Sequence, residues 1–166
     1  MADDWFGRYP GLEFERRDNG VLWITISRPE SFNSTDADLH LGLSRIWMDI
    51  DDDDDTRVVV ITGAGKAFSA GADIKGRAGK ERQPGEQWAH SRRGRETFHC
   101  IMECRKPVIG ALNGPALGAG LAVAASCDIL VASEKGSLGL PEIDVGLLGG
   151  GRHAMRLFGH SLTRRM

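Results

Sequence analysis

The chain has 166 residues, of which 41% are hydrophobic and 27% are charged, and its formal net charge is −2. This length suits one globular domain, residues 1–166, which buries roughly 70% of the surface of its unfolded chain. The near balance of 21 basic and 23 acidic residues creates no overall field that attracts nucleic acid, so no nucleic-acid partner is expected.

The sequence carries no signal for export or for a membrane. Its first residues are acidic and lack the basic and apolar blocks of a signal peptide. No apolar run approaches the ~20 residues of a membrane-spanning helix. The three cysteines cannot all pair and form no CxxC: Cys100, Cys104 and Cys127. These features predict a cytoplasmic protein without a membrane partner.

The first predicted elements are a strand and an amphipathic helix. The run Val21–Ile26 is rich in β-branched residues, and Arg28-Pro29 ends it. Thr35 and Asp38 then resemble a capping box, the polar pair that starts a helix. Apolar residues at spacings of three and four predict one buried face of this helix: Leu39, Leu43, Ile46, Trp47 and Ile50.

An acidic run, Asp51–Asp55, separates that helix from the next strand. Its alternate aspartates resemble a calcium-binding loop, but Thr56 and Thr62 stand where such a loop requires glycine and glutamate. The run therefore predicts a solvated turn. The apolar residues Val58–Ile61 predict a buried strand that ends at Thr62-Gly63.

Two segments made almost entirely of small residues follow predicted strands. Ala67–Lys75 comes after the strand at Val58–Ile61, and Gly114–Gly120 comes after an apolar run at Val108–Leu112. Segments without bulky side chains expose their backbone N–H groups, which suits the binding of an oxyanion or a phosphate. If the two segments converge in the fold, they can hold one carbonyl oxygen between them.

The second half of the chain also alternates helices and strands, which indicates an α/β fold. Gly76–Gly85 predicts a polar loop, and Gly118–Cys127, rich in alanine and glycine, predicts a closely packed helix. Ile129–Ala132 predicts a strand, and a basic amphipathic helix begins at about Arg152. A further helix is predicted at Glu86–Glu103, with four apolar contacts: Trp88, Phe98, Ile101 and Met102.

Several nucleotide and metal motifs are excluded. Gly65-Lys66 lacks both the earlier glycine and the following Ser or Thr of a P-loop. Phe68 occupies the third-glycine position of a dinucleotide fingerprint, and no GxSxG elbow is present. Cys100 and Cys104 lie beside His99 at helical spacing among apolar residues, so we assign them to packing and predict no metal. Structural roles are assigned to His40 and His90, and roles at the surface or at the edge of the core to His153 and His160.

One carboxylate, Glu142, remains as a catalytic candidate. It follows Pro141 in a turn whose other residues are mostly apolar: Leu138, Leu140, Ile143 and Val145. An apolar environment raises the pKa of a carboxyl group and suits a general acid or base. The spacing alone fits a solvated loop glutamate equally well.

Three blocks of sequence resemble the enoyl-CoA hydratase/isomerase family of the crotonase superfamily. They are Gly63–Ile74, Lys106–Gly120, and Cys127–Ile129 with Pro141-Glu142, in that order. The resemblance runs from about Gly11 to the last residue. It implies an α/β, crotonase-like spiral of repeated ββα units, usually assembled as a homotrimer or hexamer.

The resemblance also implies that the ligand is an acyl-CoA thioester. Coenzyme A would be part of the substrate, and no separate cofactor is expected. The thioester oxygen would accept hydrogen bonds from the backbone N–H groups of Ala70 and Ala119, which favour an enolate over the neutral thioester. One stretch would line the adenine end of the CoA site through its backbone: Ala70, Gly71, Ala72, Asp73 and Ile74.

The catalytic glutamates carry over only in part. Hydratases of this family use two glutamates, of which the later matches Glu142 and the earlier falls at Ala122. Alanine cannot hold water, whereas one glutamate suffices for the isomerases, so Glu142 as sole acid/base favours double-bond isomerisation over hydration. Asp144 is a weaker candidate, because on a turn or strand it points away from Glu142.

The chain also ends earlier than family members usually do. Its last residues, Arg164–Met166, lie inside a predicted helix, so the family's C-terminal helical region is expected to be largely absent. An alternative function is therefore a non-catalytic acyl-CoA-binding or assembly subunit.

Overall fold

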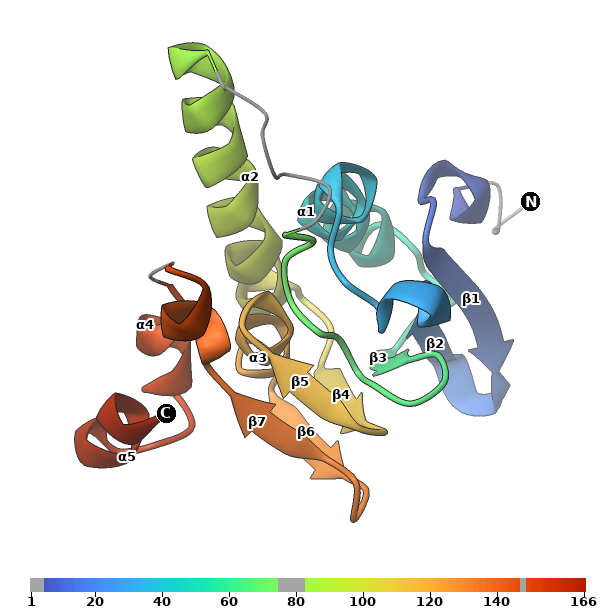
Figure 1. Ribbon diagram of the computed structural model, residues 1–166. Coiled ribbons are helices and arrows are strands. Elements are labelled where there is room, and N and C mark those ends of the chain that lie inside the picture. Colours follow the sequence, from blue (N-terminus) through green and yellow to red (C-terminus); the bar gives the residue numbers. More distant parts are fainter. Residues whose placement is uncertain (1–4, 75–82, 147–148) are drawn as a thin grey trace.

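The computed structural model describes residues 5–74, 83–146 and 149–166. Its centre is a five-stranded sheet in the order β1-β2-β3-β4-β6, with helices packed on one face (Figure 1). β1 and β2 are antiparallel, and each later pair of neighbours is parallel. The strands are β1 (Leu12–Arg17), β2 (Val21–Ile26), β3 (Val58–Gly63), β4 (Val108–Leu112) and β6 (Ile129–Ala132). The predicted α/β class is confirmed.

Strand β1 was not identified from the sequence. Its residues are mostly charged, and only Leu12 and Phe14 contribute apolar side chains to the core side. A short 3-10 turn at Asp18–Gly20 (η2) then reverses the chain, with Asn19 and Gly20 at positive φ. Left-handed residues at such a turn match the twist of a hairpin, so β1 pairs along the whole of β2.

The predicted amphipathic helix is α1 (Ala37–Asp51), and each of its five predicted core residues is at most 2% exposed. The predicted capping box is wrong, because Asp36 is the N-cap and its carboxylate accepts the N–H of Leu39 at 2.9 Å. Thr35 instead donates its N–H to Gly71 O at 2.7 Å. This bond ties the start of α1 to the segment that follows β3.

The acidic run forms the predicted turn after α1, but the expectation that it is solvated is wrong at Asp53. Asp53 is buried there, and its carboxylate accepts hydrogen bonds from Arg16, Thr56 and the N–H of Asp55. Burial raises the pKa of Asp53, but these hydrogen bonds and the charge of Arg16 outweigh it, so the pKa falls below its ordinary value. The turn therefore fastens the end of α1 to β1.

A second, smaller sheet contains part of the small-residue segments. β5 (Pro115–Leu117) pairs in parallel with β7 (Ser137–Gly139). Neither strand was predicted, because a run of three residues is too short to show a periodic pattern. The buried Phe68 lies in the chain between β3 and α2, and its N–H donates to Pro115 O at 3.0 Å.

Helix α2 (Pro84–Glu103) begins two residues before the predicted start, behind a capping box formed by Gln83 and Glu86. Its C-terminal half packs on the core through Phe98 and Ile101. Trp88 was predicted to contact the core, but 65% of its surface is exposed because the N-terminal half of α2 projects beyond the sheet (Figure 1). Most of the predicted loop, residues 76–85, lies outside the described residues.

The helices in the last third of the chain are shorter than the sequence pattern predicts. Helix α3 (Ala119–Ala124) covers only part of the predicted run, and the single basic helix expected from Arg152 is wrong. Two short helices stand there, α4 (Gly151–Ala154) and α5 (His160–Arg165), separated by a turn that ends at Gly159. The described part of the chain also contains the 3-10 helices η1 (Phe6–Arg8), η3 (Pro29–Ser31) and η5 (Pro141–Val145).

Two hydrophobic clusters hold these elements together. The larger joins the main sheet to α1, α2 and α3. The smaller fixes α4 through four buried residues: Leu121, Ala125, Leu140 and Ala154. Within the described ranges, no helix is long and apolar enough to cross a membrane.

Helix α1 offers a matched test of the core. Leu43 is 1% exposed and Met48, on the opposite side of the same helix, is 72% exposed. We expect Leu43→Ala to lower the free energy of unfolding by about 2–5 kcal/mol, since it opens a cavity. Met48→Ala should change it by less than about 0.5 kcal/mol. Urea denaturation of both variants measures this, and equal effects would contradict the packing described.

Candidate active site

The segment after β3 is held between two parts of the chain that are distant in sequence. On one side, Ser69 bridges to Ala116 of β5, with Leu117 N–H donating to Ser69 O at 2.9 Å. On the other side, Ala72 bridges to Thr35, with Asp73 N–H donating to Thr35 O at 3.0 Å. Both bridges are parallel, so residues 69–73 run as an extended strip between the two.

The two small-residue segments converge, which their composition had left open. Gly71 has φ +87°, and a Cβ added there would lie 2.6 Å from Leu117 O and 3.3 Å from Ala119 N. A Cβ added at Gly120 would lie 2.5 Å from Ser69 O. Contacts this short exclude any side chain, so the backbones touch only because both positions are glycine.

The N–H groups of Ala70 and Ala72 point to different sides of the strip. Ala70 N–H donates to Phe32 O at 2.9 Å. The backbone of Thr35 bonds to Gly71 and to Asp73. In a parallel pair, the residue between two such partners directs its own N–H away from the paired chain. The N–H of Ala72 therefore points away from Thr35, toward α3. Ala119 is the first residue of α3, where helices leave N–H groups unpaired.

These bonds contradict one expectation from the sequence. Ala70 N–H is already bonded to protein, so it is not free to bind a thioester oxygen. In residues 5–74, 83–146 and 149–166, neither Ala72 N–H nor Ala119 N–H donates to another group. The positive φ of Gly71 turns the chain between positions 70 and 72, so their N–H groups face opposite sides.

Hydrogen bonds from Asn33 hold the start of the strip in place. It is fully buried, and its amide donates to Ala64 O and Ala67 O, both at 2.8 Å. Its side-chain oxygen accepts Arg28 N–H at 2.9 Å, and its backbone carbonyl accepts the hydroxyl of Ser69 at 2.7 Å. Four bonds from one residue thus position the start of the strip.

The backbone at Phe32 and Asn33 has an unusual conformation. Phe32 and Asn33 have φ of +53° and +57°, in the left-handed region. Asparagine adopts this conformation readily, but for a bulky residue such as Phe32 it costs on the order of 1–3 kcal/mol. Strain of this kind persists only where surrounding bonds enforce it, and those of Asn33 do so here.

Glu142 lies in η5, with its carboxyl group against backbone that has no side chains. Its Oε1 would be 3.0 Å from a Cβ at Gly118 and 3.3 Å from a Cβ at Gly150. Its Oε2 is buried and has no hydrogen-bond partner among the described residues. Burial raises the pKa of Glu142, partly opposed by a bond to its own N–H. The carboxyl group therefore adjoins Gly118, the residue before Ala119.

Asp144 and Ala122 contribute nothing to the surroundings of the Glu142 carboxyl group. Asp144 is also in η5 but is exposed, and Ala122 is 1% exposed within α3. The methyl group of Ala122 provides no polar atom near Glu142.

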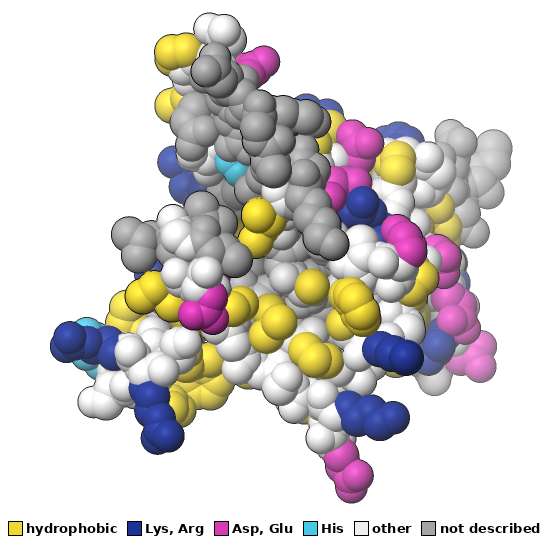
Figure 2. Space-filling view, in the orientation of Figure 1, with side chains coloured by type: hydrophobic (Ala, Val, Ile, Leu, Met, Phe, Trp, Pro, Cys, Tyr) yellow, Lys and Arg dark blue, Asp and Glu magenta, His cyan; other side chains and the backbone are white. Residues whose placement is uncertain are grey.

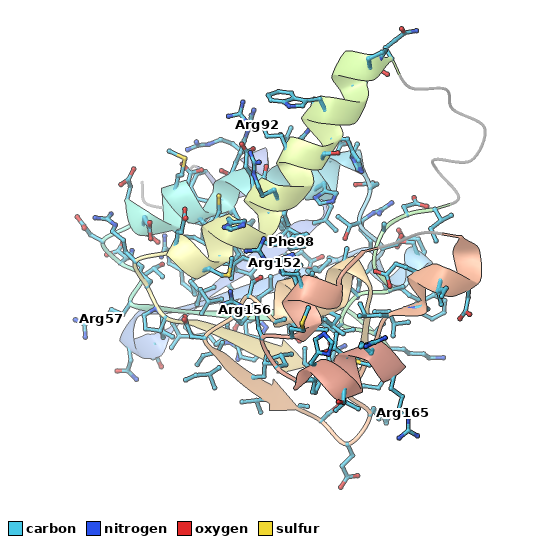
Figure 3. The ribbon with its side chains drawn as sticks, turned by 90° about the vertical axis from the view of Figure 1, so that its left-hand side faces the viewer. Arg57, Arg92, Phe98, Arg152, Arg156 and Arg165 are labelled. Carbon is cyan, nitrogen blue, oxygen red and sulfur yellow. The ribbon has the colours of Figure 1, made fainter. Side chains whose placement is uncertain are left out.

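The cysteines and histidines pack as predicted. Cys100 and Cys104 contact the main core, and burial raises the pKa of Cys104 to about 11. His40 is buried and bonds Thr97 at 2.8 Å. His153 packs on Phe98 with ring centroids 4.6 Å apart, where α4 meets α2 (Figure 3). The described residues contain no group of three or more His, Cys, Asp or Glu placed to hold a metal.

The family is decided by comparison with known proteins. The sequence profile described as enoyl-CoA hydratase/isomerase matches residues 16–166. The chain belongs to the enoyl-CoA hydratase/isomerase family. Its fold is accordingly crotonase-like.

Individual relatives agree with this family. The chain is 40% identical over 134 residues to (E)-benzylidenesuccinyl-CoA hydratase of Thauera aromatica, covering 80% of this chain and 51% of that protein. It is 34% identical to short-chain-enoyl-CoA hydratase of Clostridium acetobutylicum, covering 90% and 58%. The chain thus spans about half the length of these relatives.

Solved structures of the family superpose closely. Enoyl-CoA hydratase from Mycobacterium smegmatis matches with a TM-score of 0.87 at 29% identity, covering 95% of this chain and 62% of that one. Enoyl-CoA hydratase from Bacillus anthracis matches with a TM-score of 0.84 at 35% identity, covering 93% and 61%.

The sequence analysis missed Asn33 as a residue of the site and assigned Ala72 to the lining of the CoA site alone. Ala72 stood within the predicted CoA-lining stretch, but nothing in the sequence separated its N–H from that of Ala70. Asn33 lies in the polar segment after Arg28-Pro29, and a polar residue between a strand end and a helix start was its only signal.

Asn33 can be tested against a residue with the same backbone. Asn19 is also left-handed, with φ +64°, but it is exposed at the hairpin turn. We expect Asn33→Ala to destabilise the protein by several kcal/mol, since each buried group left unpaired costs about 1–3 kcal/mol. Asn19→Ala should cost about 1–2 kcal/mol, the conformational penalty alone. Thermal unfolding measures both, and equal losses would contradict the role of Asn33.

Proposed function

We propose that this chain binds an acyl-CoA thioester and stabilises its enolate between the N–H groups of Ala72 and Ala119. The observation that carries the proposal is the convergence of two N–H groups, both without a partner among the described residues, next to a half-buried carboxyl group. Ala72 N–H faces α3, and a Cβ at the adjacent Gly71 would lie 3.3 Å from Ala119 N. Ala72 takes the role that the sequence resemblance gave to Ala70.

Such a pair of donors favours the charged form of the ligand. When a proton leaves the carbon beside the thioester, negative charge develops on the carbonyl oxygen, and two fixed N–H groups stabilise it without rearranging. Removal of one such donor typically raises a barrier by about 3–4 kcal/mol. In this proposal Ala70, Gly71, Asp73 and Ile74 line the CoA portion through their backbone.

Glu142 is proposed as the general acid/base. Its carboxyl group adjoins Gly118, one residue before Ala119, so it lies beside the place where the thioester would bind. A buried carboxyl group with a raised pKa exchanges protons near neutral pH more readily than an exposed one. Glu142 would remove a proton from one carbon of the enoyl chain and return it to another, which is isomerisation.

Hydration is the second candidate reaction for this site. Both named relatives and both named solved structures are called hydratases, and a 2-enoyl-CoA would use the same oxyanion site. Hydration requires a held water molecule, and Ala122, where the second glutamate would stand, has no polar atom to hold it. This substitution favours isomerisation.

The substitution also supports a function of another class. A chain that binds the thioester without turnover would act as an acyl-CoA-binding or assembly subunit. Two apolar residues of the edge strand β6, Ile129 and Val131, are 54% and 59% exposed, a surface that assembly with further copies would bury; the trimer or hexamer itself is proposed from the family resemblance. The molar mass in solution, from light scattering, tests the assembly.

Glu142→Gln tests the catalytic proposal. The amide keeps the size of the side chain and removes its acid/base function, so isomerisation of a 3-enoyl-CoA should fall by roughly 10²–10⁴-fold. Binding of the substrate, measured by calorimetry, should persist. Glu134→Gln, at an exposed glutamate, is the control, and Asp144→Asn tests the neighbouring carboxylate.

Three outcomes separate the candidate functions. Rapid hydration of a 2-enoyl-CoA, lost in Glu142→Gln, would sink the preference for isomerisation. Binding without turnover of either substrate would favour the non-catalytic subunit. A wild-type chain that binds no CoA thioester would contradict the whole proposal.

The raised pKa of Glu142 also predicts a dependence of stability on pH. Below the ordinary glutamate pKa the carboxyl group is protonated in both the folded and unfolded states. As pH rises toward the higher folded-state pKa, the unfolded state ionises first, so wild type loses stability relative to Glu142→Gln. Above that value the difference stays constant. Urea denaturation between pH 4 and 8, with Glu134→Gln as control, measures this loss. A wild type that gains stability relative to Glu142→Gln as pH rises would refute the assignment.

A further inference from the structure

Arg28 contacts the segment that pairs with the strip. Its backbone is fixed by Asn33, whose side-chain oxygen accepts its N–H at 2.9 Å and whose N–H donates to its carbonyl at 2.8 Å. Its guanidinium group reaches forward along the chain, where Nη1 donates to Ser34 O and Nη2 pairs with the Asp36 carboxylate at 2.9 Å. Because a guanidinium group is a planar fork with its nitrogens in fixed positions, the two contacts hold the chain on both sides of Thr35.

The bond to Ser34 O continues through two peptide groups. A peptide group is planar and trans, so its C=O and its N–H point in opposite directions. The group that joins Ser34 to Thr35 accepts from Arg28 at its carbonyl and donates through its N–H to Gly71 O at 2.7 Å. The group that joins Gly71 to Ala72 accepts this bond at its carbonyl and directs the N–H of Ala72 toward α3.

Hydrogen bonds in such a chain strengthen one another. A carbonyl that accepts a bond makes the N–H of the same peptide group a better donor, by roughly 10–30% per bond. A bond from an ionised group is about twice as strong as a neutral one, so a guanidinium group at the start adds to the effect. Both peptide dipoles have their positive ends toward α3, in line with the charge of Arg28.

The surroundings of the strip are mostly apolar. Phe68 and Ala116 are fully buried beside it. Figure 2 shows hydrophobic side chains gathered in the middle of the face that Figure 1 presents, over the chain between β3 and α2 and over β5. A low local dielectric strengthens hydrogen bonds and their mutual polarisation, so the chain of bonds transmits more here than it would in water.

We propose that Arg28 is a positioning residue: through the two peptide groups, it orients and polarises the N–H of Ala72. The inference rests on the proposed function, in which Ala72 is one of the two donors to the thioester oxygen. Arg28 acts without touching the ligand, because Ser34 O and the strip lie on opposite sides of the peptide group between them. Its effect is therefore largest for a ligand whose oxygen carries negative charge.

Amide hydrogen exchange tests the positioning without any ligand. Arg28→Met keeps an unbranched side chain and removes both donors, so exchange of Thr35 N–H should accelerate by about tenfold or more. Leu117 N–H, which bonds to Ser69 O on the other side of the strip, should exchange within about twofold of its wild-type rate. Equal acceleration at both amides would show general destabilisation and would overturn the inference, as would an unchanged rate at Thr35.

Two CoA analogues test the polarisation. A CoA thioether without a carbonyl group offers no oxygen to Ala72, whereas one that carries a nitronate group places a negative oxygen where the enolate would have it. We expect Arg28→Met to weaken binding of the nitronate by about 5- to 50-fold and of the plain thioether by less than about twofold, since loss of a whole oxyanion donor costs about 10²–10³-fold. Arg28→Lys keeps the charge and should recover part of the loss. Arg17→Met, which removes an exposed arginine paired with Glu15, is the control.

Calorimetry gives these affinities without any assay of activity, and unfolding temperatures verify that each variant is folded. Unchanged binding of the nitronate in Arg28→Met would overturn the role of Arg28 while leaving the proposed function intact. An equal loss for both analogues would also overturn it, because the effect would then not depend on the charged oxygen. If wild type binds neither analogue, or binds both equally, the proposed function fails and the inference fails with it.

Discussion

The close approach of two backbones at Gly71 is the constraint on which the site depends. A side chain there would collide with Leu117 O, and one at Gly120 would collide with Ser69 O. The strip and α3 would then separate, and the N–H groups of Ala72 and Ala119 would no longer lie together. The small residues of both segments are therefore needed for contact between backbones, and exposure of the N–H groups follows from that contact.

Residues 33 and 35 hold the strip on the side that faces away from α3. Hydrogen bonds from Asn33 and Thr35 fix residues 64–73 in position before any ligand binds. Donors fixed in advance stabilise a developing charge better than donors that must move, because no reorganisation accompanies the reaction. The left-handed strain at Phe32 and Asn33 is the structural consequence of this arrangement, and the buried bonds of Asn33 offset it.

Two partly buried carboxyl groups show how the fold separates stability from function. Asp53 has its acceptor positions filled by Arg16, Thr56 and the N–H of Asp55, and its pKa falls below the ordinary value. Glu142 has one oxygen buried without a partner in the described part of the chain, and burial raises its pKa. An unsatisfied buried oxygen costs stability, and such a group suits proton transfer for the same reason.

The sequence by itself determined four strands of the main sheet (β2, β3, β4 and β6), the buried face of α1, the two small-residue segments and the family, because period, composition and ordered motifs are local properties. It did not determine the cap at Asp36, the exposure of Trp88 or the break between α4 and α5, since these depend on what packs nearby. Above all, it could not tell Ala70 from Ala72. Both are alanines in one bare stretch, and only the turn at Gly71 and the pairing with residues 32–35 direct one N–H toward protein and the other toward α3. The direction of a backbone N–H is set by partners distant in sequence, so only the tertiary structure decided it.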